Sequence, residues 1–384
     1  MKLRLLLLPA VLLIAVSCKK HKIKELKPEF KETYAEIVFA TYEDAHMEAV
    51  DLKNAIDAFV AAPSEALLTA AKQAWLNARE PYGQTEAFRF SGGPIDDGDG
   101  PEGLLNAWPL DEGYIDYVNG NPLSGIVNDL AVTIDKETLE ALNEEGGEKN
   151  ISIGYHAIEF LLWGQDTTLE TAGNRPYTDY LIGGTNLNQA RRGAYLKVCA
   201  ELLVDHLQLM VDAWKENGPY FMQFMAMDDD QCLTNILTGM GVLGKSELAG
   251  ERMYTALDNQ DQEDEHSCFS DNTHRDIYLN FKGISNIYYG TYTRVNGVIV
   301  DGTSLYEIIQ VKNKDLNASL SAAFAAAETS IQAIGIPFDK ALTQETTGSS
   351  GPISTAVNNL RTLGDKIAEA GSELDLTIDT NLPE

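Results

Sequence analysis

The segment from Gly154 to Gly164 limits most strongly what this chain can fold into, because it is apolar on nearly every side. A helix that is apolar all round lies in the interior of a protein. Between the two glycines only His156 and Glu159 carry strongly polar chemistry, and their i, i+3 spacing places them side by side on one helix face. A buried carboxylate is costly unless it is paired, hydrogen-bonded or bound to a cation. This predicted helix therefore brings into the interior a polar pair that needs a partner.

Three kinds of partner are compatible with the spacing of His156 and Glu159. The two side chains can bond to each other, or to a neighbouring arginine, as a satisfied network in the core. They can bind a metal, since histidine nitrogens and glutamate oxygens are ordinary ligands of zinc and iron. They can also carry out general acid–base chemistry without a metal. A lone His-x-x-Glu pattern does not choose among these three.

The N-terminus has the features of an export signal. Lys2 and Arg4 precede an apolar run that ends at Ala15-Val16-Ser17-Cys18 and is too short to span a bilayer. We expect residues 1–17 to be a signal peptide and Cys18 to be lipidated; the alternative is an ordinary signal peptide with an accidental cysteine. Residues 18–27 would then form a lipidated basic tether next to anionic head groups.

Charge and cysteine content exclude several classes of protein. The formal net charge of −29 argues against a nucleic-acid partner. Apart from Cys18 the chain has three cysteines, Cys199, Cys232 and Cys268. They allow at most one internal disulfide and form no Cys-x-x-Cys motif, which excludes a cysteine-stapled scaffold, a zinc ribbon and a thioredoxin-like site.

The long helical patterns predict an all-α protein, and its length fits two domains with sizeable cores. We place the domain boundary in the break from Gly173 to Gly184, giving an N-terminal helical domain over 28–183 and a C-terminal one over 184–384. Because Ala78–Tyr82 weakly echoes Gly250–Tyr254, we expect two helical bundles related by an internal pseudo-repeat. Helices are expected over 28–61, from Pro63 towards Phe90, over 123–145 and over 187–217, with a short hairpin near 295–300.

Two polar loops are candidates for a functional site. Residues 91–113 are rich in glycine and proline, and a long loop in a compact domain is usually functional or disordered. Because its Trp108-Pro109-Leu110 end has the pattern of an anchored segment, we expect an ordered loop near the site. An EF-hand is not expected in it, because the bidentate glutamate would fall at Trp108. Residues 259–274 hold many carboxylates and histidines, although an acidic turn before a helix N-cap would look similar. Since His156 and Glu159 need ligands from elsewhere, we expect both loops to lie on the side of His156.

The motif Gly154-x-His156-x-x-Glu159, followed by Leu161-Leu162-Trp163-Gly164, resembles the signature of the imelysin family of bacterial envelope proteins. Further stretches are similar to the same family and together span the mature chain: Arg79–Glu86, Phe88-Arg89-Phe90, Gly93–Asp96, Trp108–Asp111 and Glu265–His274. The resemblance implies an all-helical two-domain fold, an association with iron uptake and a metal site near the Gly-x-His-x-x-Glu motif. The family was first described as an insulin-cleaving metallopeptidase, an activity that does not extend automatically to every member.

The leading hypothesis is a lipid-anchored protein of the cell envelope of a Gram-negative-type bacterium, at the outer membrane and facing the periplasm. It would bind iron, zinc or an iron-containing ligand where the two helical domains meet, and act with iron-transport components. The expected metal ligands are His156, Glu159, Asp96, Asp271 and His274. Residues expected to hold these ligands or to contact a bound molecule are Arg79, Glu86, Arg89 and Ser267.

Two other functions remain open at this point. A zinc metallopeptidase would need a third ligand, an open coordination position and a base, and the chain has no His-Glu-x-x-His motif. A protein without a metal could instead use His156, Glu159 and Arg79 to recognise a polar ligand or a haem propionate.

Overall fold

The computed structural model describes the backbone of residues 7–98 and 100–382, and the side chains in these ranges from residue 19 onward. Most of the predicted signal peptide is therefore described only as backbone, its first six residues lie outside the described ranges, and so does the side chain of Cys18. The segment 18–27, predicted as a tether, is a regular part of the first helix. No helix in the described ranges is long and apolar enough to cross a membrane.

The predicted all-α class is confirmed, since helices dominate and the described residues hold only two short strands. The elements in chain order are α1 (Leu7–Ala61), α2 (Glu65–Thr85), the 3-10 turn η1 (Glu86–Phe88), α3 (Glu102–Leu105), α4 (Glu112–Ile115), α5 (Lys136–Leu142), α6 (Gly154–Trp163), η2 (Tyr177–Asp179), α7 (Gln189–Trp214), α8 (Pro219–Ala226), α9 (Asp229–Val242), the π-helix η3 (Leu243–Tyr254), α10 (Thr255–Asn259), η4 (Gln262–Asp264), α11 (Thr273–Tyr289), β1 (Thr291–Thr293), β2 (Ile299–Asp301), α12 (Leu305–Lys312), α13 (Lys314–Gln332), α14 (Phe338–Leu342) and α15 (Pro352–Glu373).

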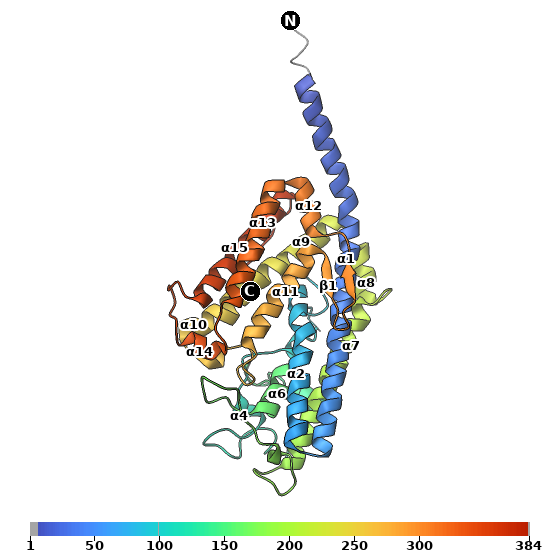
Figure 1. The fold of residues 1–384 in the computed structure, drawn as a ribbon. Coiled ribbons are helices and arrows are strands. Elements are labelled where there is room, and N and C mark those ends of the chain that lie inside the picture. Colours follow the sequence, from blue (N-terminus) through green and yellow to red (C-terminus); the bar gives the residue numbers. More distant parts are fainter. Residues whose placement is uncertain (1–6, 99, 383–384) are drawn as a thin grey trace.

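The helices pack as two groups along one long helix. Helix α1 packs against α2 and α7, and α6 lies against α2 and α7 (Figure 1). The second group contains α9, η3, α11, α13 and α15, with α13 and η3 both packed on α15. Helix α11 contacts α2, and α1 also contacts α9 and α12, so the two groups pack against each other. The division at 183/184 and the pseudo-repeat stay predictions.

Helix α6 is buried over its whole length, as its apolar sequence predicts. It begins at Gly154, whose φ of +89° favours glycine, and a Cβ there would lie 2.7 Å from the carbonyl oxygen of Leu105. The indole of Trp75 in α2 donates a hydrogen bond of 2.9 Å to the carbonyl of Tyr155. Glycine at the helix start therefore allows α6 to approach the 91–113 loop closely, and Trp75 fixes its position against α2.

The expectation of a helix over 123–145 is wrong for most of that segment, where only α5 is helical. Backbone carbonyls before α5 are satisfied by a side chain instead of by a helix. The guanidinium of Arg191 in α7 donates to the carbonyls of Ile126, Val127, Asp129 and Val132 at 2.8–3.0 Å. Because a partner distant in sequence supplies these hydrogen bonds, helical periodicity in the segment was misleading.

The predicted hairpin and the predicted 91–113 loop are both present in the structure. The run at 295–300 forms the turn and part of the second strand of an antiparallel hairpin, with Thr291 opposite Asp301. The loop 91–113 is largely irregular and contains the short helix α3 and the start of α4. Cys199, Cys232 and Cys268 are all free and buried.

Candidate functional site

The side chains of His156 and Glu159 form a fully buried hydrogen-bonded pair on α6. Nδ1 of His156 lies 2.8 Å from Oε2 of Glu159. The other oxygen of Glu159 accepts two hydrogen bonds from Ser270, at 2.9 Å from its backbone N–H and at 2.6 Å from its hydroxyl. Both carboxyl oxygens are thus engaged, and Glu159 is held between His156 and the loop that precedes α11.

A second buried histidine faces this pair. The rings of His156 and His266 meet edge to face, with their centroids 4.8 Å apart. Nε2 of His266 lies 3.2 Å from the side-chain amide of Asn106, while its Nδ1 lies 3.6 Å from Oδ2 of Asp276, beyond hydrogen-bond distance. Nε2 of His156 and Nδ1 of His266 are buried nitrogens without a hydrogen-bond partner. Such groups are rare in native proteins and require an explanation.

The interior sets the charge of these groups. Burial, with the nearby Arg79 guanidinium acting in the same direction, lowers the pKa of His156 to about 3. Burial also lowers the pKa of His266 well below its usual value, with Arg252 and His156 adding to the effect. Burial raises the pKa of Glu159 to about 8, although the hydrogen bonds from Ser270 oppose the shift. At neutral pH the site therefore holds two neutral imidazoles and a largely protonated carboxyl group.

Arg79 and Ser267, two of the predicted residues, belong to the network behind His266. The guanidinium of Arg79 donates to Asp276 at 3.1 Å and to the side-chain oxygen of Asn106 at 2.7 Å. The hydroxyl of Ser267 donates a short hydrogen bond to the same Asp276. Arg79 is fully buried among the rings of Trp75, Tyr82 and Tyr155. This network fixes Asn106 and Asp276, the two polar neighbours of His266.

Glu86, also predicted, lies on the other side of Asn106. It accepts a hydrogen bond of 3.3 Å from Asn106 and an ion-paired hydrogen bond of 2.6 Å from Arg252. Burial alone would raise the pKa of Glu86, but Arg252 and Arg89 outweigh it and lower the pKa to about 2. Glu86 is therefore ionised and holds α2, η3 and the 91–113 loop together.

A cavity of about 330 Å³ leads from the surface to His266. Its lining carries both signs of charge, with two arginines and four glutamates around an aromatic wall: Arg89, Arg252, Glu102, Glu144, Glu148, Glu247 and Trp108. The ring of Trp108 meets that of His266 edge to face at 5.6 Å. Burial raises the pKa of Glu102 to about 7, against the effect of Arg89 3.1 Å away. A polar molecule or hydrated ion of modest size fits such an opening.

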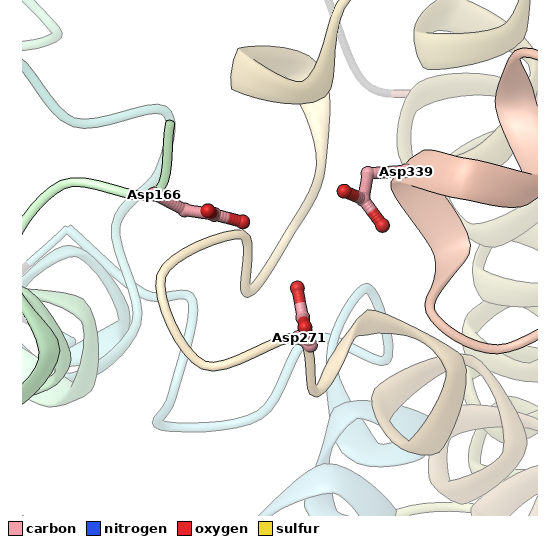
Figure 2. A group of neighbouring side chains, drawn as sticks. All are labelled: Asp166, Asp271 and Asp339. Carbon is pink, nitrogen blue, oxygen red and sulfur yellow. The ribbon is translucent and has the colours of Figure 1, made fainter. Parts of the chain in front are cut away.

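The five predicted metal ligands do not come together as one shell. Asp96 is held 3.2 Å from Nε of Arg89 and accepts a 2.6 Å hydrogen bond from the N–H of Phe90. Nδ1 of His274 lies 3.0 Å from the carbonyl oxygen of Asp271. The carboxylate of Asp271 points toward Asp166 and Asp339, as Figure 2 shows. Of the five, only His156 and Glu159 contact each other through their side chains. The 267–271 turn reaches Glu159 through Ser270, and the carboxylate of Asp271 is directed toward Asp166 and Asp339.

Both polar loops do lie beside His156, through Asn106 of 91–113 and through His266 and Ser270 of 259–274. His266, Asn106 and Arg252 were nevertheless missed as site residues. Signals were available for two of them, since His266 stands in the Glu265–His274 stretch and Arg252 in the Gly250–Tyr254 echo. Asn106 carries no pattern of its own that singles it out.

The fold and the site define an all-α protein with a buried, neutral histidine pair beside a polar cavity. The family model described as imelysin matches residues 38–367, which is most of the chain. The protein therefore belongs to the imelysin family.

Known proteins similar to this chain agree with that assignment. "Iron-regulated protein A" of Synechococcus elongatus is 27% identical over 305 residues, which cover 79% of this chain and 74% of the relative. A solved structure of a candidate iron-regulated protein A precursor from Parabacteroides distasonis superposes with a TM-score of 0.70 at 20% identity, covering 91% of this chain and 95% of that one. An imelysin-like protein from Psychrobacter arcticum gives a TM-score of 0.66 at 15% identity, over 92% and 97% of the two chains. The two structures support the fold alone.

Proposed function

We propose that this protein binds iron, or a small iron-containing ligand, through His156 and His266 and serves iron uptake in the cell envelope. The observation that carries the proposal is the pair of facing, buried and neutral imidazoles, each with a nitrogen that has no hydrogen-bond partner. A neutral imidazole binds a metal ion through a ring nitrogen once that nitrogen has given up its hydrogen, and no hydrogen-bond partner competes for these two nitrogens. Two such nitrogens suit iron(II) or zinc better than calcium or magnesium, which prefer oxygen.

In this proposal Glu159 orients His156 instead of binding the metal directly. Metal-binding histidines generally donate their other ring N–H to a carboxylate or carbonyl, which fixes the ring and its tautomer. Glu159 lies 2.8 Å from Nδ1 of His156 and is itself held by Ser270. Its role therefore differs from the ligand role expected from the motif. Coordination positions beyond the two histidines would be filled by water or by a molecule in the cavity.

Iron is favoured over zinc because of one relative. The Synechococcus protein is named iron-regulated. Its regulation by iron is a property of that protein, and it supports a related task for this chain. The bound iron would be the species that the protein captures or passes on, and this task needs no redox chemistry.

The geometry favours binding over peptide hydrolysis. A zinc peptidase needs three protein ligands and a carboxylate free to act as a base. The described residues contain one group of three His, Cys, Asp or Glu side chains whose ligand atoms all lie within 4.8 Å, and neither His156 nor His266 belongs to it. Both oxygens of Glu159 already have partners.

The proposed location is the periplasmic face of the outer membrane, through a lipid on Cys18. Exposed lysines follow this cysteine in the sequence, among them Lys19, Lys20 and Lys24. They would strengthen attachment to anionic head groups.

Cell fractionation tests the anchor: Cys18→Ala should move the protein from the membrane to the soluble fraction, and an unchanged distribution would contradict lipidation.

The metal proposal is tested by anaerobic titration of chelator-treated protein with Fe²⁺ and with Zn²⁺. The variants are His156→Ala and His266→Ala, with His206→Ala as the matched control. His206 is also a buried histidine paired with a glutamate, Glu140, at 3.2 Å, but it lies away from the cavity. We expect one ion per wild-type chain, a loss of affinity of at least about tenfold in each site variant, and no change in the control. Equal binding by all four proteins, with only the melting temperature lowered in the site variants, would show that the histidine pair is structural.

A further inference from the structure

A second group of acids lies on the far side of the turn that holds Glu159. Asp166 follows the end of α6, Asp271 precedes α11, and Asp339 belongs to α14; their carboxylates point toward one another (Figure 2). One oxygen from each lies within 4.8 Å of the others. Chain segments separated by more than 60 residues thus place three like charges together, and none of the three acids forms a salt bridge with the residues that the structure describes.

The environment of this acidic group makes its charges unfavourable. Asp166 and Asp339 are buried, and Asp271 is half-buried. Burial raises the pKa of Asp271 to about 7 and that of Asp166 to about 6, and other carboxylates of the group add to both shifts. Buried like charges are accommodated by protons or by a cation. The raised pKa values reflect the cost of burying like charges, and they are compatible with protons and with a cation.

Two unpartnered oxygens point to a cation. Oδ2 of Asp339 is buried without a hydrogen-bond partner, although its other oxygen accepts from the N–H of Lys340. The adjacent Glu265 is 1% exposed, and its Oε1 is also without a partner. Asp339, Asp271 and Asp166 are the charged neighbours that raise the pKa of Glu265 after burial itself. A fourth buried acid with a free oxygen therefore stands next to the three that converge.

We propose that Asp166, Asp271 and Asp339 form a binding site for a hard divalent cation, Ca²⁺ in the first instance, with Glu265 beside it. Oxygen-only donors select Ca²⁺, Mg²⁺ or Mn²⁺ over metals that favour nitrogen or sulfur. Ca²⁺ accepts six to eight oxygens in a flexible arrangement, whereas Mg²⁺ needs a nearly ideal octahedron. Three monodentate or bidentate aspartates with water on the open side of Asp271 suit the larger ion.

Such a cation would join α14 to the segments that carry the histidine site. Asp271 directly follows Ser270, the residue that holds Glu159 through two hydrogen bonds. Neutralising the three acids would remove their repulsion and keep this turn in place. The site uses different residues from the histidine pair, so it stands or falls independently of the function proposed above.

Calorimetric titration of the chelator-treated mature protein with CaCl₂ tests the proposal. We expect one Ca²⁺ per chain with a Kd of roughly 10⁻⁵ to 10⁻³ M. At pH 6.5, titration in two buffers of different ionisation enthalpy should reveal proton release, because Asp271 and Asp166 must lose their protons to bind. Asp339→Asn should weaken binding at least tenfold, whereas Asp315→Asn, which removes an exposed aspartate of α13, should not.

Thermal melting separates loss of the site from loss of the fold. Ca²⁺ should raise the melting temperature of the wild type and of Asp315→Asn but not of Asp339→Asn. Without Ca²⁺, Asp339→Asn should melt at or above the wild-type temperature, since a repelling charge is gone. If Asp339→Asn fails to fold, the half-buried Asp271→Asn takes its place. No Ca²⁺ binding by the wild type at about 10 mM, or equal binding by both aspartate variants, would overturn the proposal. His156→Ala should keep the wild-type affinity for Ca²⁺, which distinguishes this site from the iron site.

Discussion

The proton between His156 and Glu159 decides whether the histidine can bind a metal. Oε1 of Glu159 accepts two hydrogen bonds from Ser270, so the carboxyl proton of the neutral acid must lie on Oε2 and be donated to Nδ1 of His156. Nε2 then carries the ring hydrogen. For Nε2 to bind a metal, this hydrogen must leave and the carboxyl proton must move to Nδ1. Binding therefore releases one proton in total while Glu159 is protonated.

This exchange predicts the pH dependence of metal binding. Because the pKa of Glu159 is raised to about 8, affinity for Zn²⁺ should rise about tenfold per pH unit up to pH 8 and level off above it. The pKa of His156, about 3, lies too low to contribute in this range. Glu159→Gln should remove the pH dependence and weaken binding about 10- to 100-fold at pH 8. The side-chain amide of the introduced glutamine can donate to Nδ1 of His156, and this keeps the ring hydrogen on Nε2. Competition with a chromophoric chelator from pH 6 to 9 measures both effects.

The stability of the metal-free protein provides an independent check on the same group. A carboxyl group whose pKa is raised on folding stabilises the fold fully below its unfolded pKa, and that contribution is lost as the pH rises through about 8. The melting temperature of Glu159→Gln relative to wild type should therefore increase from pH 7 to pH 9. Glu140→Gln alters the partly exposed partner of His206. It should leave the pH dependence of metal affinity unchanged, and its melting temperature relative to wild type should not increase from pH 7 to pH 9. A wild type with pH-independent affinity would contradict the proposed proton exchange.

At the scale of elements, a buried ion network holds the irregular segments that follow α4 and α6 against α7. Asp116 is fully buried and binds two arginines. Arg192 of α7 donates from Nε at 2.6 Å and from Nη2 at 3.0 Å, and Arg175 donates at 2.7 Å. Burial would raise the pKa of Asp116, but Arg175 and Arg192 outweigh it and lower the pKa below its usual value. Asp116 thus joins the segment after α4 to α7 and to the segment after α6 through side-chain ion pairs.

Asp116→Asn should destabilise the protein strongly. It leaves the buried Arg192 without its charged partner and Arg175 with Asp179 alone, at 3.4 Å, and breaking a buried pair in this way costs about 3–5 kcal/mol. We expect the melting temperature to fall by roughly 5–10 °C, measured by circular dichroism at a fixed scan rate. Asp129→Asn is the matched control, because Asp129 is an exposed residue of the same segment. A drop of less than about 2 °C would show that the network adds little to stability.

The sequence could predict α6 and its polar pair because both depend on local spacing. The apolar surround and the i, i+3 positions of His156 and Glu159 need no knowledge of the rest of the chain. The partner ring of His266, more than 100 residues away, and the grouping of Asp166 with Asp339 depend on how segments pack, which no local pattern encodes. For the same reason local spacing wrongly predicts a helix over most of 123–145, where Arg191 satisfies backbone carbonyls.

At the scale of the whole molecule, contacts of α1 and α2 connect the two groups of helices. Helix α1 packs against α2 and α7 and also against α9 and α12, while α2 also packs against α11. Helix α7, which lies on the C-terminal side of the predicted 183/184 boundary, packs against α1 and α6. Two groups that pack against each other in this way lose these contacts when either one unfolds. We therefore expect the folded chain to behave as one cooperative unit.

Urea unfolding with two probes tests this expectation. The four tryptophans are Trp75 in α2, Trp163 in α6, Trp214 in α7 and Trp108 in the 91–113 loop. Their fluorescence therefore reports on the first group, whereas far-UV circular dichroism reports on all helices. For a cooperative unit the two midpoints coincide. The substitution Asp116→Asn, which lies in the first group, should then shift both midpoints by the same amount. If the groups unfold independently, circular dichroism will instead show a second transition whose midpoint Asp116→Asn does not move.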